Sequence, residues 1–187
     1  MRRFLFFSLI GLGVLGASGA AGAAEQAPDP AGWYGGIGLG GGLGHGGGDG
    51  GHQGSITGLV GYQFNSALGA EVQLSDSFFG HRRPPLTEDA DPTHRDFHVS
   101  AAAYGVAYLP VTPKLKLLAR AGIGDSTFTA VSSGSREHSD LASLNLGVGA
   151  VYALSSTNAL RLDVTHKDFE HHAGETDETT LSFIHRF

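Results

Sequence analysis

Eight separate runs of the sequence place apolar side chains at every second position, with small or polar side chains between them. A period of two puts successive side chains on opposite faces of a β-strand, so each run predicts a strand with one apolar face. The last run, DETTLSFIHRF, places Leu181, Phe183 and Phe187 on one face and Thr180 and Ser182 on the other. About eleven residues are enough for a tilted strand to cross a bilayer. The alternation therefore favours strands that turn an apolar face toward lipid.

The expected strands cover about residues 33–43, 55–64, 67–78, 97–109, 115–130, 140–154, 158–169 and 177–187. No segment shows the helical period of about 3.6 residues. The parity of the fourth run is ambiguous, because Tyr104, Val106 and Tyr108 oppose Val99 and the alanines. A β-bulge would resolve this ambiguity, since it inserts one residue into the alternation. The sequence predicts the strand but leaves open which of its faces meets lipid.

The connections between these runs alternate in length. Residues 65–66, 110–114 and 155–157 are tight, whereas 44–54, 80–96, 131–139 and 170–176 are longer and rich in Gly, His and acidic residues. Outer-membrane barrels have short periplasmic turns and long external loops, and an even strand count returns both termini to the periplasm. A closed sheet also leaves no unpaired strand edge in lipid. We therefore expect an all-β fold, an eight-stranded antiparallel up-and-down transmembrane β-barrel.

The N-terminus carries the features of a secretory signal peptide. Residues 1–3 are a short basic stretch, residues 4–15 are apolar, and Ala21-Gly22-Ala23 fits a small-x-small cleavage site. The apolar stretch is too short for a spanning helix, which needs about 20 residues. We expect a signal peptide at 1–23, a short periplasmic lead-in at 24–32 and one barrel domain at 33–187.

Charge and cysteine content narrow the function. Removal of residues 1–23 takes away two of the 12 basic residues and none of the 18 acidic ones, so 164 residues with a formal charge of −8 remain. An acidic chain is a poor partner for nucleic acid. The absence of cysteine rules out disulfides and thiolate metal sites. We expect no nucleic-acid partner and no cofactor.

Four segments resemble a known family. They are the opening WYGGIGLG, GLVGYQFNSALGAEVQ around the first tight turn, YGVAYLPVTPKLKLLARAGIG around the second, and the Phe187 terminus. Over about residues 32–187 the chain is similar to the small outer-membrane β-barrel domain proteins of the OmpA/OmpX and opacity-protein kind, as a barrel-only member. The resemblance implies a monomer in lipid and lipopolysaccharide, a host or cell-surface ligand, and Leu181, Phe183 and Phe187 as a signal for the barrel-assembly machinery. His185 departs from that signal.

If the apolar faces meet lipid, charged side chains must point into the barrel. The expected inward set is Glu71, Lys116, Arg120, Arg161, Asp163 and Arg186. Eight strands enclose a space that side chains just fill. An unpaired buried charge costs several kcal/mol, so the set should form ion pairs. We expect a closed interior in which Arg186 has Glu71 or Asp163 as a partner and in which the glycines of the first strand make room for arginines.

Histidines gather in the long connections. The weak candidates for metal ligands are His45, His52, His171 and His172, since imidazole suits zinc or copper. No ligand pattern such as HExxH accompanies them, so we expect no metal site. Protonation of the ten histidines below about pH 6 would carry the mature chain from −8 to about +2. The sequence thus predicts a pH-dependent surface charge.

One short motif keeps an enzymatic alternative open. His98-Val99-Ser100 places His and Ser on one strand face near the outer rim, where Glu71 or Glu137 could orient the imidazole. Some barrels of this size modify lipid A as deacylases or acyltransferases, although DFHVSAAAY does not otherwise match the deacylase pattern. We expect a non-enzymatic surface or structural barrel whose outer connections mediate adhesion or surface interactions. The alternatives are a lipid A-modifying enzyme and a narrow ion or solute channel.

Overall fold

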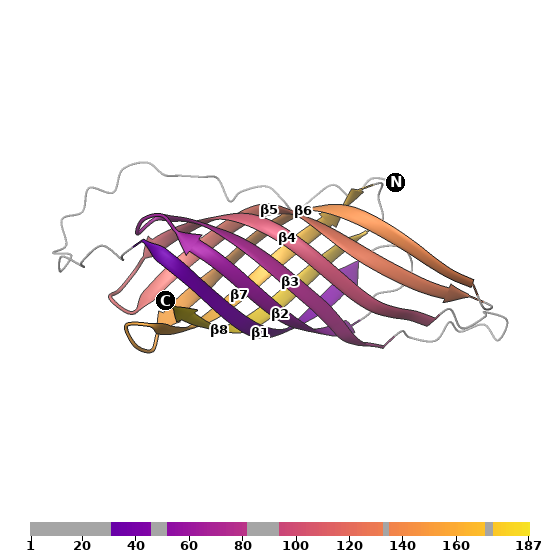
Figure 1. The fold of residues 1–187 in the computed structure, drawn as a ribbon, viewed down its shortest axis with the longest axis horizontal. Helices are drawn as coiled ribbons and strands as arrows, with labels where there is room; N and C mark the ends of the chain where they lie inside the picture. Colours follow the sequence, from indigo (N-terminus) through magenta and orange to yellow (C-terminus); the bar gives the residue numbers. More distant parts are fainter. Residues whose placement is uncertain (1–30, 46–51, 82–93, 133–134, 171–173) are drawn as a thin grey trace.

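The computed structural model describes residues 31–45, 52–81, 94–132, 135–170 and 174–187. Eight antiparallel strands close into one barrel in the order β1 to β8 (Figure 1). The strands are β1 (Gly32–His45), β2 (His52–Gln63), β3 (Leu68–His81), β4 (His94–Pro110), β5 (Leu115–Ser132), β6 (Ser135–Ala153), β7 (Asn158–Phe169) and β8 (Glu175–Arg186). The expected fold class and strand count are confirmed. The described residues contain no helix that is long and apolar enough to cross a membrane.

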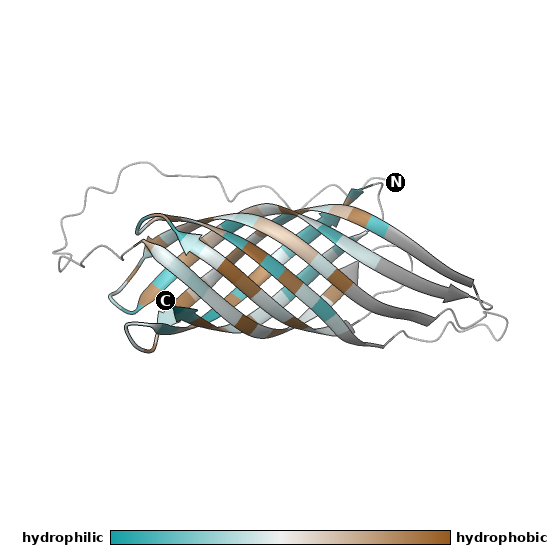
Figure 2. Cartoon of the chain, viewed as in Figure 1, coloured by the Kyte–Doolittle hydropathy of each residue, from teal (hydrophilic) through white to brown (hydrophobic). Residues whose placement is uncertain are grey.

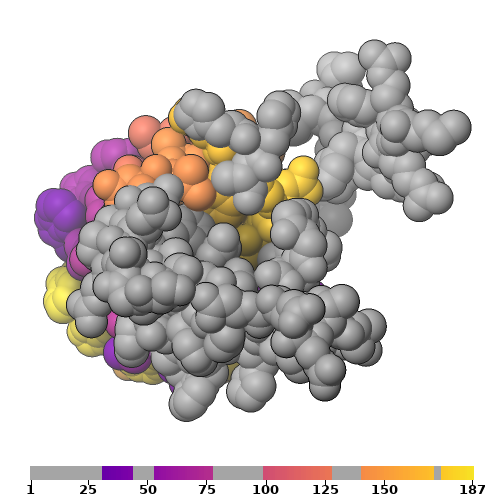
Figure 3. Space-filling model, turned by 90° about the vertical axis from the view of Figure 1, so that its right-hand side faces the viewer, coloured from indigo at the N-terminus to yellow at the C-terminus, as the bar shows by residue number. Residues whose placement is uncertain are grey.

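The two ends of the barrel differ. The three tight turns lie at one end, together with the start of β1 and the finish of β8, where Tyr34 pairs with Arg186 (Figure 1). We call this the turn end and the opposite one the outer end. At the outer end, strands from the start, the middle and the end of the chain surround the barrel axis (Figure 3). The long β5 and β6 extend furthest in this direction.

Each tight turn is held by one side-chain oxygen. Asn65 Oδ1 accepts from the backbone N–H groups of Ala67 (2.8 Å) and Leu68 (2.9 Å). The Oγ1 of Thr112 and the Oγ of Ser155 do the same for the N–H groups two and three residues further on. Such local bonds replace a backbone turn bond and favour Asn, Ser and Thr at these positions. The sequence therefore encodes the three turns independently of the rest of the barrel.

Large apolar side chains are exposed on every strand, whereas most buried side chains are polar or charged. Hydrophobic and hydrophilic residues accordingly alternate along the strands (Figure 2). Leu181 and Phe183 on β8 and Phe187, which directly follows the strand, are exposed, as their parity predicts. Aromatic rings gather outside the turn end, where Trp33 and Tyr62 meet edge to face at 5.1 Å and Tyr62 lies 5.6 Å from the next ring, Phe64. Aromatic girdles of this kind mark the border of the apolar band in membrane barrels.

The strands continue beyond the predicted limits at the outer end. Residues 131–139 were expected to be a connection, yet β5 runs to Ser132 and β6 begins at Ser135. β4 likewise begins at His94 and β8 at Glu175. Apolar alternation marks only the part of a strand that faces lipid, whereas backbone pairing needs no apolar side chain. The hydrophobic pattern therefore underestimates strand length outside the apolar band.

The fourth strand turns its larger side chains inward. Tyr104 and Val106 are buried in the barrel, whereas Val99, Ala101, Ala103 and Ala107 are exposed on the outer wall. The β4–β5 register shifts between Asp96 and His98, which places a bulge or irregularity just before this alternation begins. From Val99 to the turn end the parity is continuous, so Ala102 lies on the inner side with Tyr104.

Candidate functional site

The interior of the barrel holds the densest polar network that the structure describes. Its buried polar side chains come from six of the eight strands and include Ser55, Thr57, Gln63, Glu71, Gln73, Ser75, Arg120, Ser126, Ser143, Asn145, Arg161, Asp163, Thr165, Lys167, Glu178, Thr180 and Ser182. Buried polar groups are stable only when they find partners. The contacts in this network therefore decide what the barrel can do.

Near the turn end, one guanidinium binds two carboxylates. Arg161 donates through Nε to Asp163 Oδ2 (2.8 Å) and through Nη2 to Glu71 Oε2 (3.0 Å), and its Nη1 donates to Glu71 Oε1. All three side chains are at most 3% exposed. A planar fork satisfies both oxygens of a carboxylate at once, which is the strongest form of such a pair. The charges of this layer are thus directly paired.

Two tyrosines complete the same layer. Tyr34 donates its hydroxyl to Glu71 Oε1 at 2.6 Å, and Tyr108 donates to the same oxygen at 3.3 Å. The two hydroxyls are 3.0 Å apart. Glu71 therefore receives hydrogen bonds from β1, β4 and β7, so its carboxylate links strands on opposite sides of the barrel.

A second guanidinium lies one layer further toward the outer end. Arg120 Nη1 donates to Gln73 Oε1 at 2.8 Å, and its Nε donates to Thr165 Oγ1 at 3.1 Å. The guanidinium carbon lies 4.5 Å from the ring centre of Tyr104, which gives a cation–π contact. Asn145 Nδ2 in turn donates to the Tyr104 hydroxyl at 3.2 Å. Arg120 has no carboxylate among its contacts in the described residues, so neutral oxygens and a ring satisfy it.

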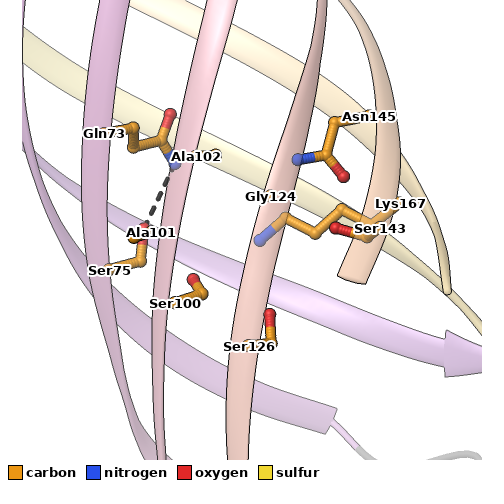
Figure 4. Close-up of a pocket in the computed structure, with 10 residues that line it drawn as sticks. All are labelled: Gln73, Ser75, Ser100, Ala101, Ala102, Gly124, Ser126, Ser143, Asn145 and Lys167. Carbon is orange, nitrogen blue, oxygen red and sulfur yellow. Dashed lines mark hydrogen bonds between the residues drawn. The ribbon is translucent and has the colours of Figure 1, made fainter. Parts of the chain in front are cut away.

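Hydroxyl groups dominate the layer nearest the outer end. Lys167 Nζ lies 2.6 Å from Glu178 Oε2, and Ser55 donates to Glu178 Oε1 at 2.8 Å. Figure 4 shows Lys167 and Asn145 pointing into the same space as Ser75, Ser100, Ser126 and Ser143. The dashed line there is the bond from Gln73 Nε2 to Ser75 Oγ, 3.1 Å long. One ion pair and several hydroxyls thus fill this layer.

Several buried atoms of the network lack a hydrogen-bond partner in the described residues. They are Asn145 Oδ1, Thr180 Oγ1 and Ser182 Oγ, while Glu178 Oε2 has Lys167 as an ion-pair partner but accepts no hydrogen bond of good geometry. Ser182 pairs with Arg161 and Thr180 with Asp163 across the β7–β8 ladder, whereas Asn145 pairs with Lys167 across the β6–β7 ladder. The charged groups near the turn end are therefore satisfied, while neutral oxygens beside them and near the outer end are left without a partner in the described residues.

Many interior contacts join strands that are not neighbours, and glycine explains how. Gly61 of β2 lies between Tyr34 and Glu71, and a Cβ there would be 2.3 Å from the Tyr34 ring. Gly147 of β6 lies between Arg120 and Thr165, and a Cβ there would be 2.9–3.0 Å from both. A glycine on the intervening strand leaves the space through which the two side chains meet.

The glycines of β1 have different neighbours from those expected. A Cβ at Gly36, Gly38 or Gly40 would come within 3 Å of side chains of β8, namely Ile184, Ser182 and Thr180. The glycine that lies against an arginine is Gly147, next to Arg120. The small residues of the first strand therefore accommodate the last strand directly.

The predicted inward charges separate into two groups. Glu71, Arg120, Arg161 and Asp163 are buried in the network. Lys116 and Arg186 are half-buried at the turn end. Arg186 donates a hydrogen bond to Gln63, whereas the carboxylates of Glu71 and Asp163 accept hydrogen bonds from Arg161.

The network also includes residues outside the predicted inward set, among them Lys167, Glu178 and Tyr34. Lys167 and Glu178 have the same parity as Asp163 and Thr180 on their own strands, so extending the alternation toward the outer end would have found them. The inward position of Tyr34 follows from the parity of the first strand. Its bond to Glu71 does not, because the alternation within one strand does not show which residues of β1 and β3 lie opposite each other across β2.

Other candidates fall partly outside the described residues. His171 and His172 lie outside them, and the side chains of His45 and His52 are not described. Where the structure describes side chains, no group of three or more His, Asp or Glu could hold a metal ion. For the enzymatic motif, Ser77 pairs with His98, and Glu71 lies six residues away along β3 with both oxygens bound to Arg161. Glu71 therefore does not orient that histidine.

Solved structures show the same fold. The barrel is similar to neisserial surface protein A (NspA), with 13% identity and a TM-score of 0.68 over 83% of this chain and 97% of that one. It is also similar to Ail, the attachment invasion locus protein of Yersinia pestis, with 15% identity and a TM-score of 0.62 over 83% and 99%. The N-terminal barrel domain of Pseudomonas aeruginosa OprF has 13% identity and a TM-score of 0.59 over 83% and 99%.

Family comparison agrees with the architecture. No curated protein sequence matches the chain significantly. Residues 9–187, most of the chain, match the model of the outer membrane protein beta-barrel domain. With its closed eight-stranded barrel, apolar outer wall and polar interior, the chain belongs to the outer membrane protein beta-barrel domain family.

Proposed function

We propose that the protein is a non-enzymatic surface barrel with a closed interior, which acts through its outer end. In this proposal the turn end and both termini face the periplasm, and residues 1–23 are removed on export. Outer-membrane barrels place short turns in the periplasm, which supports this orientation. The barrel then holds the outer connections at the cell surface.

The observation that carries the proposal is the interior network. The Arg161, Arg120 and Lys167 layers succeed one another along the barrel axis, and their contacts link opposite walls. An eight-stranded barrel has only enough interior space for such side chains. A solute would have to break several buried charged contacts to pass, which disfavours the channel alternative.

The charge of the outer end indicates the kind of ligand. Exposed carboxylates gather outside this end on Asp76, Asp125, Asp140, Asp168, Glu170 and Glu175. Among the exposed side chains described there, no lysine or arginine balances them. Ail has been solved with sucrose octasulfate, a heparin analogue. We propose that this barrel instead disfavours sulfated, polyanionic ligands and contacts neutral or cationic surfaces.

Adhesion of bacteria that express the barrel tests the proposal. One strain carries the full chain and a matched strain carries a variant in which residues 46–51 and 82–93 are replaced by short Gly-Ser connections. Both proteins should fractionate with the outer membrane and migrate differently before and after boiling. We expect only the full chain to raise adhesion to an epithelial monolayer, without retention on heparin beads at physiological salt.

The same strains separate the alternatives. Equal adhesion by both strains would contradict the proposed role of the outer end. A lipid A mass spectrum that loses or gains an acyl chain when the barrel is expressed would support the enzymatic alternative instead. An unchanged spectrum together with loop-dependent adhesion is the result that we expect.

A further inference from the structure

The seam between β1 and β8 closes the barrel, and the inner face of β1 is almost bare. Its inward positions from Gly36 to Gly42 are all glycine. Because no side chain rises from this stretch, residues of β2 and β8 can meet across it. One such contact crosses the glycine stretch toward the outer end, and a second joins β2 to β8 beside the start of β1 at the turn end.

The outer contact joins Ser55 of β2 to Glu178 of β8. The Ser55 hydroxyl donates to Glu178 Oε1 at 2.8 Å, and both side chains are buried. Ser55 pairs with Gly40 on β1, and Glu178 pairs with Gly42. A Cβ at Gly40 would lie 2.9 Å from Ser55 Oγ and 2.7 Å from Thr180 Oγ1. This bridge therefore depends on glycine in the strand that it crosses.

The turn-end contact joins Gln63 of β2 to Arg186 of β8. Arg186 Nη2 donates to Gln63 Oε1, and Gln63 Nε2 donates to the Asn65 carbonyl at 2.8 Å. Gln63 pairs with Gly32, and Arg186 pairs with Tyr34. The second bridge thus fastens the last residues of β8 to the first tight turn, again across β1.

The backbone alone specifies the seam register weakly. A shift of two residues keeps every inward side chain inward and every apolar side chain outward. Along β1 such a shift exchanges one glycine for another on the inner face and Ile37 for Leu39 on the outer face. The same shift moves the partners of both bridges apart by about 7 Å, which is beyond hydrogen-bond reach.

We propose that the Ser55–Glu178 and Gln63–Arg186 bridges set the register in which β8 closes on β1. In the structure Ile37 pairs with Phe183. In a register shifted by two residues Ile37 would pair with Leu181 or with His185. The bridges favour the first arrangement because they form in it and in neither of the others.

Cysteine cross-linking tests this proposal directly, because the natural chain has no cysteine. Ile37→Cys is combined in turn with Phe183→Cys, Leu181→Cys or His185→Cys, and the disulfide yield is measured only in the folded, heat-modifiable band after refolding in detergent. In the otherwise unchanged barrel we expect the pair with Phe183→Cys to dominate. In this register the pairs with Leu181→Cys and His185→Cys are diagonal neighbours about 7–8 Å apart, and their disulfide yield gives the background.

Removal of both bridges should allow β8 to pair with β1 in a register shifted by two residues. In Ser55→Ala/Gln63→Ala we expect one of the shifted pairs to rise about tenfold or more above its background, since two net hydrogen bonds are lost. Thr57→Ala is the matched control, because Thr57 faces inward on the same strand but bonds to Ser75 of β3, away from the seam. This control should keep the original pair.

If the double variant does not fold, the two single variants provide the test. Ser55→Ala and Gln63→Ala each retain one bridge and should give a smaller rise in the shifted pair. If every folded bridge variant cross-links only through the pair with Phe183→Cys, as Thr57→Ala does, the bridges do not set the register and the proposal is wrong.

Discussion

The two ends of the barrel interior satisfy their polar groups in different ways. Near the turn end, Arg161 binds Glu71 and Asp163, and two tyrosines donate to Glu71. Near the outer end, the Lys167–Glu178 pair stands among hydroxyls, and the buried Oδ1 of Asn145, which pairs with Lys167 across the β6–β7 ladder, has no partner in the described residues. The charged groups near the turn end are fully bonded to one another, whereas the outer layer is neutral in most of its atoms and incompletely bonded.

The difference indicates where the barrel is held together. A saturated charged layer penalises any change that removes one partner, because the remaining charges stay buried. A layer that holds fewer charges and an unpartnered amide oxygen loses less when one side chain is changed and is more tolerant. We therefore expect the turn end to dominate stability and the outer end to accept substitution, which agrees with a functional role for the outer end.

The largest expected effect is loss of the shared guanidinium. Arg161→Met leaves Glu71 and Asp163 buried without their cation, which should lower the free energy of unfolding by about 3–5 kcal/mol. Urea unfolding of the refolded barrel in lipid vesicles measures this change. Arg161→Met/Glu71→Gln/Asp163→Asn, which removes all three charges, should recover part of the loss. A stability equal to that of the natural barrel in Arg161→Met would show that the turn-end layer is not the stabilising one.

A methyl group at Gly61, the glycine that lies against the Tyr34 ring, should have the next largest effect on the free energy of unfolding. The added Cβ in Gly61→Ala meets the Tyr34 ring at 2.3 Å and displaces it from Glu71. Overpacking of this kind costs about 1–3 kcal/mol. Gly58→Ala on the same strand is the control, since a Cβ there has nothing within 4 Å. Equal unfolding midpoints for the two variants would show that the Tyr34–Glu71 contact past Gly61 does not stabilise the barrel.

Loss of the outer ion pair should cost less than loss of Arg161. Lys167→Met removes one partner of Glu178, which still accepts from Ser55. A hydrogen-bonded charge pair contributes about 1.5–3 kcal/mol, so we expect a loss of about 2 kcal/mol in the same unfolding measurement. A larger loss than that of Arg161→Met would reverse the ranking of the two layers.

The smallest effect concerns a hydroxyl without a partner. Ser182 Oγ is buried and makes no hydrogen bond in the described residues. Its removal in Ser182→Ala should leave stability within about 0.5 kcal/mol of the natural barrel or raise it slightly. Ser55→Ala, which breaks a bond to Glu178, is the contrasting variant. A clear loss of stability in Ser182→Ala would reveal a partner, such as ordered water, beside Arg161.

The sequence predicts the outer wall better than the interior. Leu181 and Val148 face lipid as their parity indicates, because the apolar environment of every lipid-facing position is the same. The inward side of β4 was ambiguous, since Tyr104 and Val106 are themselves apolar or aromatic and so give no contrast with the alanines outside. Parity identifies a face only where the two faces differ chemically.

The hydrogen-bond partners inside the barrel depend on how the sheet closes on itself. The alternation of residues within a single strand carries no information about that closure. Parity alone identifies Glu71 and Arg161 as inward residues, but their contact joins β3 to β7 across the barrel. Tyr34 reaches Glu71 because Gly61 lies between them, a relation that depends on the register of three strands. Such contacts require the strand registers and the curvature of the closed sheet, which the alternation of one strand does not specify.

In the proposed function the interior of the barrel is closed, so that the outer end makes the functional contacts. The most direct test is the conductance of the purified, refolded barrel in a planar bilayer. We predict no conductance steps above the background of the lipid alone, whereas a variant with Glu71, Arg120, Arg161 and Asp163 all changed to alanine should conduct. Reproducible open steps from the natural barrel would contradict the claim.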